Sequence, residues 1–352
     1  MRSVNKKIIF SAGGTGGHLF PAQRVAQDLQ SSCEILFVGA KLGTSPFFDR
    51  SQFNFSEISS ATFSLKNPLK IVKSLFLIVK GFFQSLHILK TFTPDCVVGF
   101  GSYYSLPMLM AAWIKRVPIL LHEQNTIPGK VNRLFAPYAK KVAITFPETK
   151  NYLKGNLIQV AFPLKKYSSG CLGITKERLT LLIFGGSQGS AALNHLILEA
   201  VPELSQKLPP FQILHFTGTE EMALEARKVW SEYGIPHYVR PFEKEMGSAL
   251  KLADLAIVRA GAATLAELIF FNLPALLIPF PHATENHQIH NGRYFVQEVQ
   301  GGEMCLEQEL KGSKLAQEIF LLEKDRFQKR KNIQEYKNKR VWIEFSEVIL
   351  NE

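Results

Sequence analysis

The sequence has few cysteines and few acidic residues for its length. Its 352 residues include 4 cysteines, which form no Cys-x-x-Cys pair. Disulfide scaffolds and zinc sites use paired or densely spaced cysteines, so neither is expected. Acidic residues number 30 against 41 Lys and Arg, which gives a formal net charge of +11. This excess predicts attraction to an anionic partner: nucleic acid, a phosphorylated metabolite or an acidic membrane surface.

Long apolar runs are also missing. The run at residues 8–10 is too short for the core of a signal peptide. Residues 75–79 are flanked by Lys73 and Lys80, whereas a spanning helix needs about 20 apolar residues. We therefore predict a protein that is not exported and does not cross a membrane. The chain is longer than a single hydrophobic core supports, which predicts two domains.

Two segments share a pattern of strand, glycine turn and helix. The strand at 7–10 leads into glycines at 13–17, after which Pro21 is predicted to open a helix over 22–29. The same pattern returns with a strand at 181–184, glycines at 185–189 and a predicted helix over 191–204. Alternating strands and helices predict an α/β fold with parallel sheets. The predicted domains are residues 1–162 and 163–336, with a C-terminal helix at 337–352 completing the first.

Glycine-rich turns between a strand and a helix suit the binding of phosphate. Their backbone N–H groups reach an anion at the positive helix N-terminus, where side chains would obstruct the approach. Two such turns predict sites for two phosphate groups. Neither turn ends in Gly-Lys-Ser/Thr, which excludes a P-loop NTPase. Leu19 stands where a dinucleotide fingerprint requires its third glycine, so NAD binding is disfavoured.

Three other interpretations stay open from the residues alone. The turn at 185–189 also fits the G-x-S-x-G elbow of serine hydrolases, for which Asp254 with His282 or His287 would complete a triad. His287 and His290 lie at the i, i+3 spacing of one helix face, but the absence of a second ligand pair argues against a metal. The positive charge alone is compatible with nucleic acid, although the sequence contains no recognised binding module.

His18 ends the first glycine turn. A helix N-terminus keeps an imidazole neutral and able to accept a proton, which suits a general base. The alternative role for His18 is capping or packing of the helix. Composition and spacing do not decide between the two.

Five motifs, taken together and in order, match a known family. The chain resembles the MurG family of glycosyltransferases over residues 8 to about 310. The matching motifs are Gly-Gly-Thr-Gly-Gly-His at 13–18 with Pro21, His-Glu-Gln-Asn at 122–125, Gly-Gly-Ser-Gln-Gly at 185–189 with Asn194, Arg-Ala-Gly-Ala-Ala-Thr-Leu-Ala-Glu at 259–267, and Pro281-His282 through His287-Gln288 to Asn291.

The resemblance implies the GT-B fold, with two Rossmann-like domains, and transfer of N-acetylglucosamine from UDP-N-acetylglucosamine to undecaprenyl-pyrophosphoryl-MurNAc-pentapeptide (lipid I). It implies an inverting displacement by the MurNAc 4-hydroxyl, His18 as the candidate base, and neither a cofactor nor a metal. It also implies a location at the cytoplasmic face of the inner membrane. A lipid glycosyltransferase that uses another UDP-sugar is the nearest alternative.

By this resemblance Ser187 contacts the donor phosphate, Glu267 the ribose hydroxyls and Gln288 the sugar. The implied donor-binding residues are Thr15, Gly16, Gly17, Asn125, Lys165, Gly186, Ser187, Gln188, Gly189, Phe242, Glu243, Ala262, Ala263, Thr264, Leu265, Ala266, Glu267, Gln288 and Asn291. The implied acceptor-binding residues are Gly13, Gly14, Gly101, Ser102, Tyr103 and Glu123.

The chain departs from the family pattern in two places. Ser102 and Leu106 replace two glycines of the family's third turn, so the geometry of that turn is expected to differ. Lys165 stands where the family has an arginine, so a bidentate contact becomes a point charge.

The segment at residues 63–90 interleaves basic and apolar side chains. It contains five lysines, large apolar groups such as Phe76 and Phe83, and no acidic residue. This composition predicts an interfacial helix that rests on anionic lipid. The alternative is an ordinary amphipathic helix with its apolar face in the core.

Overall fold

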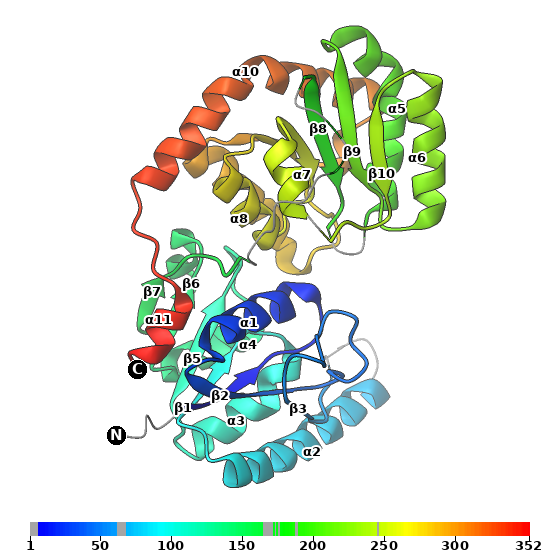
Figure 1. Cartoon of the computed structure of the whole chain (residues 1–352). Coiled ribbons are helices and arrows are strands. Elements are labelled where there is room, and N and C mark those ends of the chain that lie inside the picture. The colour runs from blue at the N-terminus through cyan, green and yellow to red at the C-terminus, as the bar shows by residue number, and fades with distance from the viewer. Residues whose placement is uncertain are drawn as a thin grey trace. The chain divides into compact units, whose positions relative to one another are not determined.

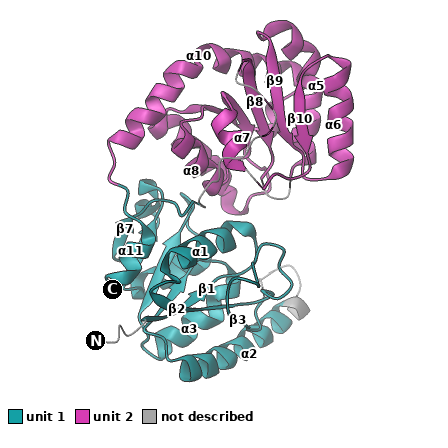
Figure 2. Cartoon of the chain, in the orientation of Figure 1, with its two compact units in different colours: residues 1–164, 342–352 teal, residues 165–341 magenta. Residues whose placement is uncertain are grey.

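The structure is a computed structural model that describes residues 6–61, 68–164, 172, 174, 177–186, 189–244 and 246–352. It divides into two compact units (Figure 2). Unit 1 comprises Met1–Leu164 and Trp342–Glu352, and unit 2 comprises Lys165–Val341. Each unit is a parallel sheet covered by helices (Figure 1). The predicted α/β class with parallel sheets is confirmed.

Unit 1 contains a seven-stranded sheet in the order β3-β2-β1-β4-β5-β6-β7. Every pair of neighbouring strands is parallel, with Ile8 of β1 opposite Ile35 of β2 and Cys96 of β4. The strands are β1 Lys6–Ser11, β2 Cys33–Gly39, β3 Phe55–Glu57, β4 Cys96–Gly99, β5 Ile119–Glu123, β6 Lys141–Ile144 and β7 Leu157–Gln159.

Helices cover both faces of this sheet. Successive side chains of a strand point to opposite faces, and in β1 both sets are apolar: Ile8 and Phe10 pack with α1 and α11, whereas Ile9 packs with α2, α3 and α4. The helical elements are α1 Gly16–Leu29, α2 Pro68–Phe92, η1 Tyr103–Ser105, α3 Leu106–Ile114, α4 Lys130–Phe135, η2 Ala136–Tyr138, η3 Pro147–Asn151 and α11 Phe345–Leu350. A strand buried on both faces explains the continuous apolar run read from the sequence.

Helix α1 begins earlier than the sequence predicted. Pro21 was expected to open the helix, but α1 starts at Gly16 and holds Pro21 in its interior. Proline lacks the N–H that would bond the carbonyl of Gly17. The prediction was wrong because the glycines, which were assigned to the turn, already form the first helical turn.

Helix α2 is more apolar than expected. Its stretch Ile71–Phe92 is, by length and composition, apolar enough to cross a membrane, despite Lys73 and Lys80. The absence of a side chain at Gly81 lets α2 pack closely on the rest of unit 1, because a Cβ there would lie 1.8 Å from the Ser59 carbonyl oxygen. The neighbouring face of the helix is exposed, so α2 combines one packed face with one free face.

The C-terminal segment packs on the sheet of unit 1. Phe345, Val348 and Ile349 of α11 are buried in the same core as Phe10 and Phe100. The backbone N–H of Ala161 donates to the Ile343 carbonyl at 2.8 Å. Unit 1 is therefore built from two separate stretches of chain.

Unit 2 contains a six-stranded parallel sheet in the order β10-β9-β8-β11-β12-β13. The strands are β8 Leu179–Phe184, β9 Phe211–Phe216, β10 His237–Arg240, β11 Leu255–Val258, β12 Ala275–Leu277 and β13 Gly302–Met304. The helical elements are α5 Ala191–Lys207, α6 Glu220–Glu232, α7 Met246–Leu252, α8 Ala262–Phe271, η4 Thr284–Asn286, α9 His287–Tyr294, the π-helix η5 Phe295–Val299, η6 Glu307–Glu309 and α10 Gly312–Asn338. Helices α5, α6 and α10 share one apolar core with the sheet.

Candidate active site

The two glycine turns of unit 1 lie at the switch point of its sheet. From β1 the chain builds β2 and β3 on one side and then crosses to β4 on the other. In open parallel sheets, ligands bind outside the carboxyl ends of the strands at such a point. The turns that follow β1 and β4, at residues 12–15 and 100–102, both leave the sheet at this edge.

The N-terminus of α1 is open to solvent. Its cap residue, Thr15, makes no side-chain capping bond, and the first turn contains no acidic residue. Thr15 and Gly17 are exposed. The first amides of a helix have no partner within the helix, so this terminus offers donors and positive potential to an anion.

Tyr104 joins the two turns of unit 1. A Cβ on Gly13 would lie 2.7 Å from the Tyr104 Cβ, and one on Gly14 would lie 3.0 Å from the Tyr104 ring. Gly14 also has φ +88°, which favours glycine. These two glycines are needed because the tyrosine packs directly against the backbone.

Ser102 adopts a backbone conformation that is usual only for glycine. Its φ and ψ are 74° and 149°, and its hydroxyl accepts a 3.3 Å hydrogen bond from the Tyr104 N–H. The preceding Gly101 also has positive φ, +81°. The turn thus keeps the shape that glycine allows, with a serine in place.

His18 lies between the two turns. Its Nδ1 is 2.8 Å from the Phe100 carbonyl oxygen and 2.9 Å from Nε2 of Gln124, which follows β5. A Cβ on Gly101 would lie 3.3 Å from the His18 ring, so the glycine makes room for the imidazole. His18 is half-buried, beside the open end of α1.

The Glu123 side chain, which the resemblance assigns to the acceptor, holds a loop in this structure. The carboxylate is 1% exposed. It accepts hydrogen bonds from the N–H groups of Asn125 and Gly129, both at 2.9 Å, and from Asn132 Nδ2 at 2.8 Å. Burial raises the pKa of Glu123, and these hydrogen bonds oppose the rise. This carboxylate fixes the loop that carries Asn125. No sequence pattern marks Asn132, so its part in the site is seen only in the structure.

His122 is buried beneath the site. Its ring contacts Phe100, Phe162 and Phe345, and neither ring nitrogen has a hydrogen-bond partner among the described residues. Burial, with a smaller contribution from nearby His18, lowers the pKa of His122 to about 3. His122 is therefore neutral at physiological pH.

Unit 2 repeats the arrangement at its own switch point, between β8 and β11. The turn after β8 has positive φ at Gly186, +89°, and at Gly189, +70°. A Cβ on Gly189 would lie 2.5 Å from the Thr217 carbonyl oxygen, so the turn packs closely against the end of β9. Of the predicted donor contacts, Ser187, Gln188 and Lys165 lie outside the described residues.

The second element at this switch point is the N-terminus of α8. Its cap residue, Gly261, has no side chain, and the first turn, which includes Ala262 and Ala263, contains no acidic residue. Glu267 is half-buried about one turn further along the helix. The side chain of Leu265 is fully buried, and its N–H bonds the Gly261 carbonyl. Its assignment to the donor stays a prediction.

Arg259 connects the loops around this site. Its guanidinium is 4% exposed and donates to the Ile278 carbonyl at 3.1 Å and to the Ser190 hydroxyl at 2.6 Å. It also forms a salt bridge with Glu307. Sequence reasoning assigned Arg259 no role, although a charge directly after a buried strand was an available signal. Glu307 had no such signal.

Two predicted donor contacts are themselves engaged within unit 2. Asn291 is fully buried, and its Nδ2 donates to the Ala260 carbonyl at 3.2 Å. Gln288 is half-buried and accepts from the Phe280 N–H at 2.9 Å through Oε1, which turns its amide nitrogen away from that contact. Asn291 therefore fixes the loop before α8, whereas Gln288 still has donors to offer.

Phe242 and Glu243 follow β10 at the same sheet edge. Phe242 is 59% exposed, and Glu243 is mostly buried, where it accepts a hydrogen bond from the Tyr238 hydroxyl at 2.9 Å. An exposed aromatic ring beside a fixed backbone suits a planar ligand.

The serine hydrolase alternative fails on geometry. Asp254 precedes β11, and its carboxylate accepts from the Thr180 N–H at 3.0 Å, at the amino ends of the strands. The turn at 185–189 leaves the carboxyl end of β8. Asp254 and this turn are separated by the length of the sheet, so Asp254 is not part of a triad there. Among the described residues, no group of three His, Cys, Asp or Glu is placed to hold a metal ion.

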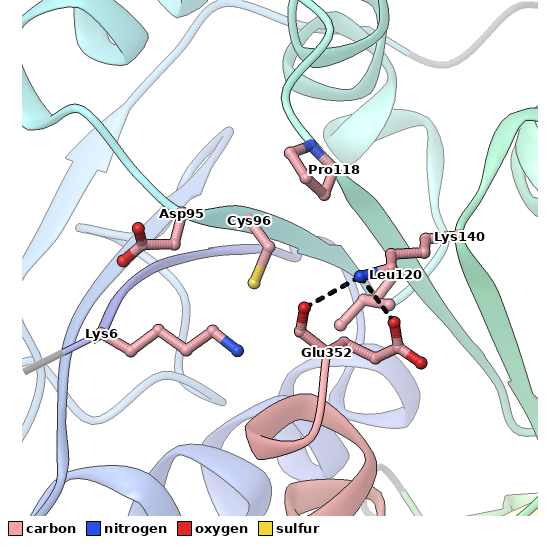
Figure 3. Close-up of a pocket in the computed structure, with 7 residues that line it drawn as sticks. All are labelled: Lys6, Asp95, Cys96, Pro118, Leu120, Lys140 and Glu352. Atoms are coloured by element: carbon pink, nitrogen blue, oxygen red, sulfur yellow. Dashed lines mark hydrogen bonds and ion pairs between the residues drawn. The ribbon is translucent and has the colours of Figure 1, made fainter.

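A pocket of about 460 Å³ lies at the opposite edge of the first sheet (Figure 3). Lys6, Cys96 and Lys140 line it, at the amino ends of their strands. Lys140 is paired with Glu352 at 2.8 Å, as the dashed lines in Figure 3 show. Burial raises the pKa of Cys96 to about 11, so the thiol stays protonated. This pocket is not at the edge where parallel sheets bind ligands.

Comparison with known proteins agrees with this arrangement. The N-terminal domain of glycosyltransferase family 28 matches residues 8–144, and the C-terminal domain of the same family matches residues 180–344. A protein of Protochlamydia amoebophila named UDP-N-acetylglucosamine--N-acetylmuramyl-(pentapeptide) pyrophosphoryl-undecaprenol N-acetylglucosamine transferase is 43% identical over 91% of this chain and 88% of its own length. A Chlamydia pneumoniae protein of the same name is 33% identical over 93% and 92%. The crystal structure of Acinetobacter baumannii MurG superposes with a TM-score of 0.79 at 26% identity, covering 98% of both chains.

Proposed function

The chain belongs to glycosyltransferase family 28, and from this premise we propose that it transfers N-acetylglucosamine from UDP-N-acetylglucosamine to lipid-linked MurNAc-pentapeptide. The observation that carries the proposal is the pair of open helix N-termini at the two sheet switch points, in a chain 43% identical to a transferase of that name. Both substrates contain a diphosphate, and each switch point offers amides to one.

Unit 2 binds the donor in this proposal. The N–H groups of Ala262, Ala263 and Thr264 at the start of α8 bind the diphosphate, together with the turn at 185–189. Glu267 accepts hydrogen bonds from both ribose hydroxyls, because its two oxygens each suit one of them. Phe242 covers the uracil, and Gln288 donates to the sugar. Arg259 and Asn291 hold these loops in place.

Unit 1 binds the acceptor. The start of α1, with Gly13 and Gly14, and the turn at Gly101–Tyr103 present their backbones to the acceptor diphosphate. The excess of positive charge in the chain, +11, supports attraction of both anionic substrates.

The chemistry is a direct displacement that inverts the anomeric carbon. The MurNAc 4-hydroxyl attacks C1 of the donor sugar, and His18 accepts the proton as the new C–O bond forms. The bond from C1 to the phosphate oxygen breaks, and UDP leaves with the electron pair. Helix amides in place at the diphosphate stabilise the charge that develops there.

Unit 1 also rests on the membrane that holds the acceptor. The free face of α2 exposes Val72, Phe76, Val79 and Phe83, by 45–68% each, with Lys73, Lys80 and Lys90 beside them. Helix α3 packs on α2, and Trp113 in its last turn is 49% exposed. Exposed aromatic and basic groups together suit the interface of an anionic bilayer. We place the enzyme at the cytoplasmic face, where UDP-sugars are made.

A donor comparison tests the proposal. Purified protein is given radiolabelled UDP-N-acetylglucosamine, UDP-glucose or UDP-galactose with the lipid-linked acceptor, and the lipid product is counted. We expect label transfer from UDP-N-acetylglucosamine to exceed that from the other two by at least tenfold. Preference for UDP-galactose or UDP-glucose would instead support another lipid glycosyltransferase, and label released as free sugar would contradict transfer.

A further inference from the structure

The Gln124 side chain contacts Nδ1 of His18. Gln124 follows β5 and is 4% exposed, whereas His18 is in the first turn of α1. Gln124 Nε2 lies 2.9 Å from His18 Nδ1, which also lies 2.8 Å from the Phe100 carbonyl oxygen. One ring nitrogen is thus contacted from two elements that are distant in sequence.

The Phe100 carbonyl decides which ring nitrogen of His18 carries the proton. A carbonyl oxygen only accepts hydrogen bonds, so at 2.8 Å it requires a proton on Nδ1. In the neutral ring, Nε2 is then the basic nitrogen. This is the tautomer that a general base acting through Nε2 needs.

The same proton settles the orientation of the Gln124 carboxamide. An amide nitrogen only donates, so Nε2 opposite a protonated Nδ1 would place two donors together. The Oε1 of Gln124 is buried and has no hydrogen-bond partner among the described residues. Rotating the amide by half a turn brings Oε1 to Nδ1, which separates the two donors and gives the buried oxygen a partner, and Nε2 then takes the position that Oε1 had.

We propose that Gln124 is a positioning residue for His18: with Phe100 it accepts the Nδ1 proton, fixes the tautomer and ring orientation, and stabilises the imidazolium formed in the reaction. The proposal rests on the proposed function, in which His18 is the base. As the acceptor hydroxyl proton moves to Nε2, positive charge spreads to Nδ1–H, and two carbonyl-type oxygens are already placed to receive it. A neutral amide does this without the permanent charge of a carboxylate.

Other ionisable groups around His18 leave this role to Gln124. From β5, His122 is neutral because burial lowers its pKa to about 3. Glu123 directs its carboxylate to Asn125, Gly129 and Asn132. The turn after β4 contributes two titratable side chains, Tyr103 and Tyr104 of η1. On α1 itself, Arg24 is paired with Asp28 at 2.7 Å and bonds the Leu164 carbonyl.

The first test is the tautomer of His18 in the wild-type protein. Nitrogen NMR of ring-labelled histidine distinguishes protonated from bare ring nitrogens, and the His18→Gln spectrum identifies the signals. We expect Nδ1 protonated and Nε2 bare near pH 8. A bare Nδ1 would overturn the proposal without any Gln124 variant, and this reading does not depend on transferase activity.

The second test compares Gln124→Leu and Gln124→Glu by their pH profiles. Leucine leaves only Phe100 at Nδ1, so we expect kcat to fall about tenfold, with the KM for UDP-N-acetylglucosamine unchanged. Glutamate places a negative charge beside Nδ1–H, which raises the pKa of His18 and moves the acidic limb of kcat/KM up by about one pH unit. Gln27→Glu, on the exposed face of α1, is the matched control and should shift nothing.

Two results would separate failure of this inference from failure of the proposed function. If the wild type is active and the Gln124→Glu and Gln124→Leu variants have the same pH profile as the wild type, only the positioning role is refuted. A wild-type protein that transfers no sugar from any UDP donor would refute the function and leave the NMR result standing.

Discussion

Arg259 donates a 2.6 Å hydrogen bond to the hydroxyl of Ser190, and so ties the end of β11 to the first turn of α5. Ser190 is the cap of α5 and also accepts from the Leu193 N–H. The two strand ends joined in this way, β8 and β11, form the switch point where we place the donor diphosphate. One buried guanidinium therefore sets the spacing of the two turns between which we place the donor diphosphate.

The first prediction follows from that contact. Arg259→Lys keeps the charge but loses the fork that reaches Ser190, Glu307 and two carbonyls. We expect the KM for UDP-N-acetylglucosamine to rise at least tenfold and the free energy of unfolding to fall by about 2 kcal/mol. Arg330→Lys, at a 42% exposed arginine of the same unit whose 3.7 Å ion pair with Asp254 a lysine can keep, should change both little. Steady-state kinetics and urea unfolding check this, and equal effects of the two variants would contradict it.

The second prediction concerns Glu267 and the ribose. Two charge-assisted hydrogen bonds of about 1.5–3 kcal/mol each are lost in Glu267→Ala, so the Kd for UDP should rise about 100-fold or more. Calorimetry of the wild type and Glu267→Ala, each with UDP and with 2′,3′-dideoxy-UDP, completes a cycle in which the protein group and the ligand hydroxyls are removed separately and together. The substitution should not affect binding of the dideoxy nucleotide, whereas Glu298→Ala, an exposed glutamate, should affect neither. An equal loss of affinity for both nucleotides would show that Glu267 does not contact the ribose hydroxyls.

The sequence predicted the sheets and both glycine turns because each rests on local signals. Buried strands of a parallel sheet are continuous apolar runs, and their glycine turns are conspicuous. Residues 8–10 and 181–184 are such runs, and both lie within central strands. The start of α1 was mispredicted because Pro21 is ordinarily a helix-opening residue.

Residues that hold the site together were harder to predict than residues that face a ligand. Gln124 contacts His18, which is 106 residues away, and Arg259 contacts Ser190, which is 69 residues away. Asn132 contacts Glu123, nine residues earlier, across a loop that the sequence does not mark. Only the folded chain brings these partners together. The resemblance also assigned Glu123 and Leu265 to the ligands, and only the folded chain shows that both side chains are buried.

The third prediction concerns the strained serine. Ser102, at φ 74° and ψ 149°, is in a region that costs a non-glycine residue about 1–3 kcal/mol. Ser102→Gly relieves this strain but, like Ser102→Ala, loses the 3.3 Å hydrogen bond from the Tyr104 N–H, so the free energy of unfolding should be about 1 kcal/mol higher with glycine than with alanine. Ser102→Ala keeps the strain and should not stabilise. Denaturant unfolding of the three proteins decides, and stabilisation by alanine as large as by glycine would show that strain is not the cause.

The fourth prediction tests the membrane face of α2. Lys73→Glu with Lys80→Glu reverses two charges on the exposed face, and should reduce flotation with anionic vesicles several-fold. Phe76→Ser with Phe83→Ser removes apolar contact and should reduce it as well. Lys228→Glu with Lys251→Glu makes the same charge change on exposed positions of unit 2 and should float like the wild type. Equal flotation of all four proteins would rule out this surface.

The fifth prediction is a pH dependence of stability. Burial lowers the pKa of His215 to about 3; its Nε2 bonds Asn194, and its Nδ1 accepts from Trp230. Because the unfolded histidine titrates near 6.5, the unfolded state binds more protons below that pH, and stability falls as pH drops toward 3. Between pH 7 and pH 5 this difference in proton binding lowers the free energy of unfolding by about 2 kcal/mol. Hydrogen exchange of β9 peptides should show the slope in the wild type and a weaker slope in His215→Leu.

The central claim is inverting transfer with the sugar delivered to the acceptor hydroxyl, and the configuration of the new bond tests it most directly. Purified protein, UDP-N-acetylglucosamine with ¹³C at C1 and the lipid-linked MurNAc-pentapeptide are incubated, and the product is examined by NMR. The donor bond is α, so a single displacement predicts a β bond to the 4-hydroxyl of MurNAc in every turnover. An α-linked product, or release of labelled N-acetylglucosamine to water without a disaccharide, would contradict the account.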